Sequence, residues 1–172
     1  MKYAWKLGAA LAVAGAVWIA LLAFGARQDA IRAKRTAEDL ARAIIAFKAE
    51  FSSYPTAYGN ADAYMTTDDA DLIQSLISES DDPLSPRRLT LLKLPEDAIE
   101  RGELTIDDRG KPIALLDPWG SPYHLWIDSN EDGALTNPDP ATGCTIRLGA
   151  IAVSPGPDAE LSTWEDNVTS WH

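Results

Sequence analysis

The sequence has very few of the side chains on which most enzyme sites depend. Its 172 residues include one cysteine and two histidines. A single cysteine, Cys144, excludes an internal disulfide and a zinc cluster built from cysteines. A nucleophilic site needs a base and an orienting group beside the nucleophile, but His124 lies within an expected strand and no histidine is near Cys144 in sequence. No glycine-rich phosphate loop precedes a helix. The sequence therefore predicts a protein that is not an enzyme.

Positive charge is also scarce. The chain has 15 Lys and Arg against 26 Asp and Glu, which gives a formal net charge of −11. Proteins that bind nucleic acids present a basic face, so we expect no nucleic-acid partner. The acidic surplus suits a domain that holds cations, although solubility alone would also account for it.

Near its beginning the chain has a long run without charge, Leu7 to Ala26. Twenty residues of helix span about 30 Å, the thickness of the hydrocarbon core of a bilayer. We therefore expect residues 1–26 to form a membrane anchor or signal segment, with the lipid bilayer as the partner of residues 7–26. Retention is favoured because a helical pattern continues directly beyond the run. A cleaved signal peptide is the alternative, because Ala23 and Gly25 are small residues at cleavage-site spacing.

Residues 27–55 have the pattern of an amphipathic helix. Apolar side chains recur every three or four positions, at Ala30, Ala33, Ala37, Leu40, Ile44, Phe47 and Phe51. The helix is expected to end at Ser52–Pro55, since the residue before a proline is driven out of helical geometry. A second, short helix is expected over the stretch that follows Thr66 and Thr67, either of which is a suitable cap.

From Leu104 onward the sequence is typical of β-structure. Short apolar stretches at Leu104–Ile106, Pro112–Leu116, Tyr123–Ile127 and Thr145–Val153 are separated by turn residues. Together with the helices they predict an α+β domain over residues 56–172. The complete expectation is an N-terminal transmembrane helix that continues into a long amphipathic helix packed on a small antiparallel sheet.

Four stretches resemble one known family. They are AIIAFKAEFSSYPT (43–56), LLDPWGSPYHL (115–125), SPGPDAE (154–160) and WEDNVTSW (164–171). Together they resemble the pseudopilins of type II secretion, especially the C-terminal domain of the major pseudopilin, and they imply a pilin-like fold. The prepilin leader motif of that family, a glycine followed by Phe-Thr-Leu-x-Glu, does not occur in this sequence.

The resemblance implies a non-enzymatic subunit of a type II secretion or related pilus-like assembly. Its partners would be other pseudopilin-like subunits or further copies of itself, through Leu40, Ile44 and Phe47. It would be a single-pass protein of the bacterial inner membrane whose C-terminal domain faces the periplasm. The alternative is a stand-alone tethered or secreted calcium-binding domain that recognises an extracellular ligand.

The stretch DSNEDGALTNPD, residues 128–139, fits the pattern of a calcium loop. Calcium takes six to eight oxygen ligands, which alternate residues of a tight loop can supply. The pattern predicts as ligands Asp128, Asn130, Asp132, the carbonyl of Ala134, and Asp139. A polar hairpin turn without an ion remains the alternative, because Asp139 is shorter than the usual glutamate and prolines flank it.

A second calcium loop follows from the resemblance. In the major pseudopilin the loop that corresponds to residues 156–167 binds calcium, and matching positions imply Asp158, Asp166 and Asn167 as ligands. Two loops of this kind are typical of millimolar extracellular calcium, which favours an exoplasmic domain.

Overall fold

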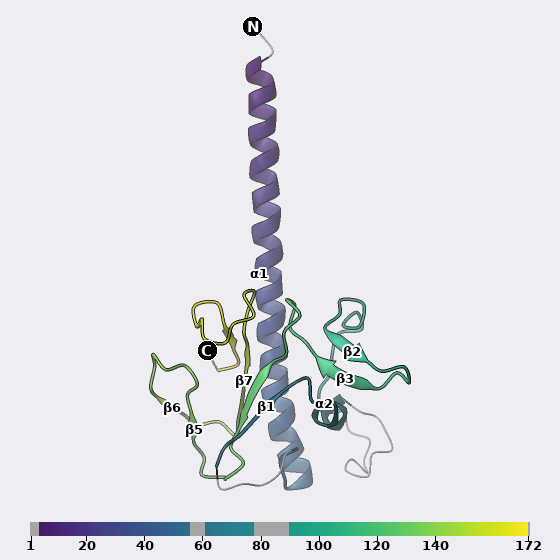
Figure 1. The fold of residues 1–172 in the computed structure, drawn as a ribbon, viewed down its shortest axis with the longest axis vertical. Helices are drawn as coiled ribbons and strands as arrows, with labels where there is room; N and C mark the ends of the chain where they lie inside the picture. The colour runs from purple at the N-terminus through teal and green to yellow at the C-terminus, as the bar shows by residue number, and fades with distance from the viewer. Residues whose placement is uncertain (1–3, 56–60, 78–89, 172) are drawn as a thin grey trace.

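The computed structural model describes residues 4–55, 61–77 and 90–171, and for residues 4–17, 19 and 22 it describes the helical backbone alone. Within these described ranges, two helices and eight strands follow one another (Figure 1). Their bounds are α1 Ala4–Phe51, β1 Ala63–Thr66, α2 Ala70–Ile77, β2 Leu104–Ile106, β3 Pro112–Leu115, β4 His124–Ile127, β5 Leu135–Thr136, β6 Thr145–Ile146, β7 Ala150–Ser154 and β8 Val168–Thr169.

The strands form one main sheet and two small hairpins. The main sheet has four strands in the order β1-β4-β7-β8, and every pair in it is antiparallel. The pairs β2–β3 and β5–β6 form separate two-stranded sheets. Figure 1 shows β2 and β3 on one side of α1 and the β5–β6 hairpin with the C-terminal segment on the other.

The C-terminal part of α1 packs on one face of the main sheet. Its predicted apolar face provides the contact, because Ala33, Ala37, Leu40 and Ile44 are each 0% exposed. The opposing positions of β7 are also small, so that helix and sheet approach closely. The helix ends at Phe51, and Ser52 follows with a φ of 57°. Its end agrees with the Ser52–Pro55 signal.

The buried face of α1 also corrects one prediction. Leu40, Ile44 and Phe47 are 0%, 0% and 5% exposed, and they belong to the core that the helix forms with α2 and the sheet. These side chains are already covered by the chain itself. They are not an association surface.

The predicted transmembrane helix is wrong. Within the residues that the structure describes, no helix has the length and apolar character needed to cross a membrane. The buried part of α1 instead has its apolar face on the sheet, as the 0% exposure of Ala33, Ala37 and Leu40 shows. The single-pass inner-membrane location with a periplasmic domain was inferred from that anchor and is corrected with it. Most of the run Leu7–Ala26 lies outside the described side chains, and the alternative of cleavage after Gly25 remains a prediction.

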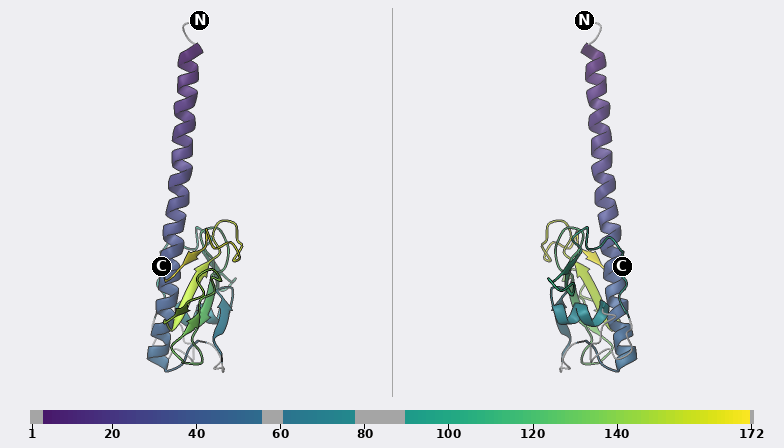
Figure 2. Two further views of the ribbon diagram at one scale, coloured as in Figure 1. Left: turned by 90° about the vertical axis from the view of Figure 1, so that its left-hand side faces the viewer. Right: turned by 90° about the vertical axis from the view of Figure 1, so that its right-hand side faces the viewer.

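The N-terminal half of α1 extends far beyond the sheet. At 1.5 Å per residue the 48-residue helix is about 72 Å long, and Figures 1 and 2 show that only its lower part runs beside the strands. Among the described side chains of the extended half, Trp18, Leu21 and Phe24 are 65%, 60% and 62% exposed. Large apolar side chains therefore face solvent on a helix that has no partner there within the described chain.

The DPWGSPY stretch forms a buried corner before β4. The Asp117 carboxylate accepts hydrogen bonds from the backbone N–H groups of Trp119 and Ser121 at 3.0 and 2.9 Å. Its other oxygen accepts the Ser154 hydroxyl at 2.6 Å, and Gly120 has the positive φ, 94°, that the turn requires. The corner thereby fixes the end of β7, from which the loop over residues 155–167 departs.

Candidate metal centre

The main sheet brings two acidic residues together at one of its ends. In the antiparallel pair β1–β4, Ala63 lies opposite Ile127. Asp62 immediately precedes Ala63, and Asp128 immediately follows Ile127. Because antiparallel strands place the residue before one strand beside the residue after the other, Asp62 and Asp128 meet at this end of the sheet.

The turn after β4 adds a third carboxylate. Asp128 is 4% exposed, and its two carboxylate oxygens accept the N–H groups of Asp132 at 3.1 Å and Gly133 at 2.9 Å. These bonds fold the chain back over Asp128. Gly133 has a φ of 77°, which a side chain would disfavour. The sharp reversal that the sequence pattern predicted is therefore present and brings the Asp132 side chain back toward Asp128.

A carboxylate oxygen from each of Asp62, Asp128 and Asp132 lies within 4.8 Å of the other two. Oxygen ligands of calcium lie about 2.3–2.6 Å from the ion, so two of them stand at most about 5 Å apart. The three oxygens therefore fit around one such ion. Their chemistry, hard oxygen without nitrogen or sulfur, suits calcium or magnesium and not zinc.

The cluster is electrostatically incomplete within the described chain. Asp62 Oδ1 is buried and accepts no hydrogen bond. Burial raises the pKa of Asp62, the nearby charges of Asp132 and Asp128 raise it further, and only the backbone N–H of Thr136 acts in the opposite direction. No lysine or arginine of the described residues forms an ion pair with any of the three carboxylates. A bound cation would relieve both the repulsion and the unsatisfied oxygen.

The nearest basic side chain is used elsewhere. Lys48 of α1 contacts the Glu131 carboxylate at 3.3 Å and lies over the ring of Tyr54, 4.6 Å from its centroid. Glu131 belongs to the same turn as Asp128 and Asp132, so this ion pair ties the turn to the end of α1. It leaves the charges of the cluster itself uncompensated.

The other predicted ligands of this loop are arranged differently. Asn130 Oδ1 accepts the Asp132 N–H at 3.1 Å, and the Ala134 N–H donates to Asp132 Oδ1 at 2.9 Å. Asp139 lies in the β5–β6 connection, where its carboxylate accepts the N–H of Ala141 at 2.8 Å. The structure therefore brings Asp128 and Asp132 together with Asn130 beside them, and Asp62 joins this group where the pattern had assigned Asp139.

The second predicted loop has a different arrangement. The Asp158 carboxylate accepts the N–H of Glu160 at 2.9 Å and the hydroxyl of Thr163 at 2.5 Å. These bonds, the Thr163 one foremost, lower the pKa of Asp158. Asp166 packs against Gly156, where an added Cβ would lie 2.5 Å from the Asp166 carbonyl oxygen. Within the described residues, Asp158 and Asp166 belong to no group of three acidic, histidine or cysteine side chains that could hold a metal.

Asn167 is the exception in that loop. Its Nδ2 donates to the Leu161 carbonyl at 2.9 Å, whereas its Oδ1 is buried and accepts no hydrogen bond. An unsatisfied buried oxygen is what a further ligand would complete. The predicted ligands Asp158 and Asn167 are nevertheless engaged in separate hydrogen bonds, and the second loop remains a prediction.

Asp62 is the residue that sequence reasoning missed. It lies 66 positions before Asp128, outside the loop pattern, and no local spacing connects the two. Its one signal is its place directly before a strand that pairs with the strand ending at Ile127. That signal requires the strand register, which local sequence does not supply.

The comparisons with known proteins identify no relative. No protein-family model, no curated protein and no solved structure matches the chain.

Proposed function

We propose that the chain is a non-enzymatic subunit of a pilus-like assembly, similar to the pseudopilins of type II secretion, and that calcium stabilises its sheet. The observation that carries the calcium part is the cluster of Asp62, Asp128 and Asp132, whose oxygens lie within 4.8 Å of one another. The ion would join the beginning of the edge strand β1 to the turn after β4. The ion would compensate the negative charge of the three carboxylates. Its role would be structural and not catalytic.

The assembly part is supported by the extended half of α1. Trp18, Leu21 and Phe24 are all at least 60% exposed, although side chains of this size usually contribute to a core or an interface. A long helix that is covered by its own sheet at one end and bare at the other suits a subunit whose neighbours cover the bare part. The family resemblance of the DPWGSPY and SPGPDAE stretches implies the same role.

Calcium binding is tested by titration calorimetry of the full chain with Ca²⁺. We expect binding by the wild type and a loss of at least tenfold in affinity for Asp132→Ala, whose exposed side chain can be removed without opening the core. Asp108→Ala, which removes one exposed carboxylate from the β2–β3 turn, is the matched control and should bind as the wild type does. Equal affinity in all three proteins would disprove the site.

Assembly is tested by sedimentation of the full chain over a range of concentrations. The wild type should form oligomers, and the double variant Leu21→Asn/Phe24→Asn should not. Leu148→Asn, at a residue that is 41% exposed between β6 and β7, is the control. A wild type that binds calcium and remains monomeric at all concentrations would favour the stand-alone calcium-binding domain instead.

A further inference from the structure

A basic cleft lies between α1 and the segment that precedes β2, in a protein whose net charge is −11. The cleft has a volume of about 350 Å³, and four basic side chains, Arg32, Arg35, Lys93 and Arg101, line it. Two acidic side chains, Asp39 and Glu103, also line it. The local charge is therefore opposite in sign to that of the molecule as a whole.

The floor of the cleft is internally paired. Glu103, 7% exposed, accepts two hydrogen bonds from Arg101 at 3.0 and 2.9 Å and lies 3.4 Å from Arg32. Asp39 pairs with Arg42, one turn further along α1. The acidic groups of the cleft are thus already used by Arg32, Arg101 and Arg42.

The rim of the cleft is not paired. Arg35 and Lys93 are both exposed, and neither side chain forms an ion pair or hydrogen bond with another described residue. Deeper in the cleft, Arg32 Nε is buried and donates to no acceptor in the described chain. The cleft therefore presents two free positive charges and one unsatisfied donor. This combination fits a ligand that carries two carboxylates.

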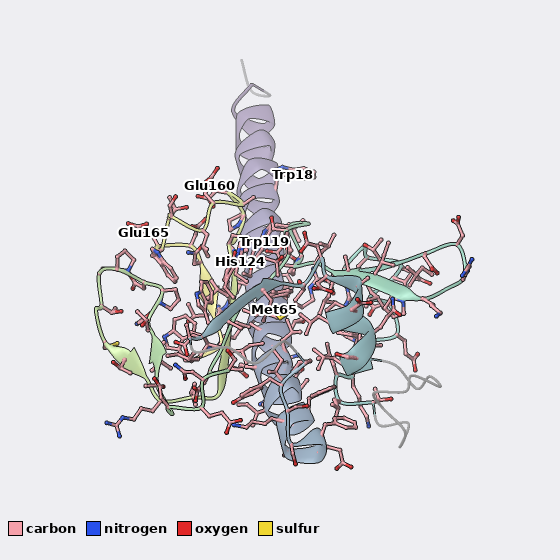
Figure 3. All side chains as sticks on the ribbon, turned by 60° about the horizontal axis from the view of Figure 1, so that its bottom comes forward. Trp18, Met65, Trp119, His124, Glu160 and Glu165 are labelled. Carbon is pink, nitrogen blue, oxygen red and sulfur yellow. The ribbon has the colours of Figure 1, made fainter. Side chains whose placement is uncertain are left out.

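A matching pair of carboxylates is present on the opposite side of α1. Glu160 and Glu165 are exposed in the loop over residues 155–167, and neither side chain has a partner among the described residues. The sequence after Arg147 contains four acidic residues, Asp158, Glu160, Glu165 and Asp166, and no lysine or arginine. Figure 3 labels Glu160 and Glu165 on the loop that lies to the left of α1.

The two charged surfaces cannot meet within one molecule. Figure 1 shows the C-terminal loop on one side of α1 and the segment with β2 and β3 on the other. Between two copies they can meet, because each copy then offers its loop to one neighbour and its cleft to the other. Such a contact uses two different surfaces and leaves one of each free after every addition, so it propagates into a chain of subunits.

We propose that the basic cleft with Arg35 and Lys93 at its rim binds the Glu160–Glu165 loop of a second copy of this chain. The proposal rests on the assembly role proposed above and names the contact that gives the assembly its direction. The exposed half of α1 would supply apolar contact area between subunits, but apolar contact alone does not fix how two subunits are oriented. Complementary charges fix the register of neighbouring subunits and steer their encounter.

The test uses charge reversal in the full chain, with self-association measured by sedimentation in calcium at low and high salt. The cleft variant is Arg35→Glu/Lys93→Glu, and the loop variant is Glu160→Lys/Glu165→Lys. Each alone should associate at least about tenfold more weakly than the wild type, since complementary charges become like charges. The control, Arg109→Glu/Lys111→Glu in the exposed β2–β3 turn, should associate as the wild type does.

Mixing the two variants is the decisive step. The loop of the cleft variant remains negative and the cleft of the loop variant remains positive, while the reversed surfaces also complement each other. A 1:1 mixture should therefore regain association close to that of the wild type, which misfolded variants could not do. High salt should weaken the wild type and the mixture alike.

Three results would overturn the proposal. The first is a cleft variant that associates as strongly as the control. The second is a loop variant that associates as strongly as the control, which would mean that the cleft binds some other anion. The third is a mixture that associates as weakly as either variant alone. All three leave the assembly role intact, since the wild type still associates. A monomeric wild type would instead contradict the assembly role itself, and this contact with it.

Discussion

Replacing Asp62 by asparagine should have opposite effects with and without calcium. The change removes one negative charge from the cluster and keeps the shape of the side chain and the oxygen that accepts the Thr136 N–H. Two like charges 4.8 Å apart, the greatest separation of these oxygens, repel by about 0.9 kcal/mol in a water-like dielectric and by about 3.5 kcal/mol at an effective constant of 20. Asp62 is partly exposed, so the lower value is appropriate. Relief from both Asp128 and Asp132 then amounts to about 2 kcal/mol.

In a chelator the variant should therefore be the more stable protein. About 2 kcal/mol corresponds to a midpoint of thermal unfolding roughly 4–8 °C higher for a chain of this size. With calcium the order should reverse. An ion bound only by the folded state adds about 2.7 kcal/mol at one hundred times its Kd, and the wild type gains this while the variant loses a charged ligand.

The effect in chelator also has a pH dependence with a defined sign. The pKa of Asp62 is raised in the folded protein above its ordinary value of 3.8, so the folded state holds the proton more tightly than the unfolded state does. This group therefore destabilises the fold increasingly as pH rises above about 3.8, and the penalty is complete once the pH exceeds the raised pKa. The gain from Asp62→Asn should be present at pH 7 and absent near pH 3.

The assay is thermal unfolding of the full chain followed by circular dichroism, in EDTA and in millimolar CaCl₂. Asp108→Asn, which removes an equal charge from an exposed turn, is the control and should shift neither midpoint. A variant that is destabilised equally in EDTA and in calcium would refute the reasoning, because it would make Asp62 an ordinary structural residue.

Three further changes have defined outcomes. Ile44→Ala should lower the free energy of unfolding, measured in urea, by about 2–5 kcal/mol. Ile45→Ala, at the exposed neighbouring residue, should lower it little. Gly156→Ala should destabilise by about 1–3 kcal/mol, since its Cβ would lie 2.5 Å from the Asp166 carbonyl oxygen. Gly102→Ala, with a similar φ and open space around it, should cost less. Burial lowers the pKa of His124 below 6.5, so stability should fall as pH drops below about 6.5 and His124→Gln should flatten that slope.

The parts of the fold that depend on local pattern could be predicted from the sequence. The spacing of Ala33, Ala37, Leu40 and Ile44 identified the face of α1 that the sheet covers, because helical periodicity needs only neighbouring residues. The turn at Asp117 is local in the same sense, because Pro118 fixes φ and Gly120 permits the positive φ that the turn needs. In each instance the pattern that reveals the element lies within neighbouring residues, although the Ser154 bond to Asp117 does not.

The uncharged run before Arg27 illustrates where local pattern misleads. Length and absence of charge suggested a membrane span, yet no helix among the described residues is long and apolar enough for one, and the C-terminal part of α1 packs on the sheet. An uncharged stretch reports only that its environment tolerates apolar side chains. Lipid and the helices of neighbouring subunits both do so, and the sequence alone does not distinguish them. Leu40 was predicted to contact other subunits and is instead buried in its own chain. An apolar face does not reveal whether its partner belongs to the same chain.

The acidic cluster shows why the remainder of the site required the structure, and also why an ion there would matter to an assembling subunit. β1 is an edge strand with one partner, β4, and Asp62 and Asp128 face each other where that pair begins. In the same turn Glu131 reaches Lys48 on α1. Repulsion among the three carboxylates opposes the approach of β1 to the turn after β4. A bound cation would turn this net repulsion into attraction. Ion binding would therefore press the edge strand and the turn together and, through Glu131, hold both against the end of α1. In the proposed assembly, neighbouring copies would meet surfaces that are fixed relative to α1, so a firmer attachment of sheet to helix would make those contacts better defined.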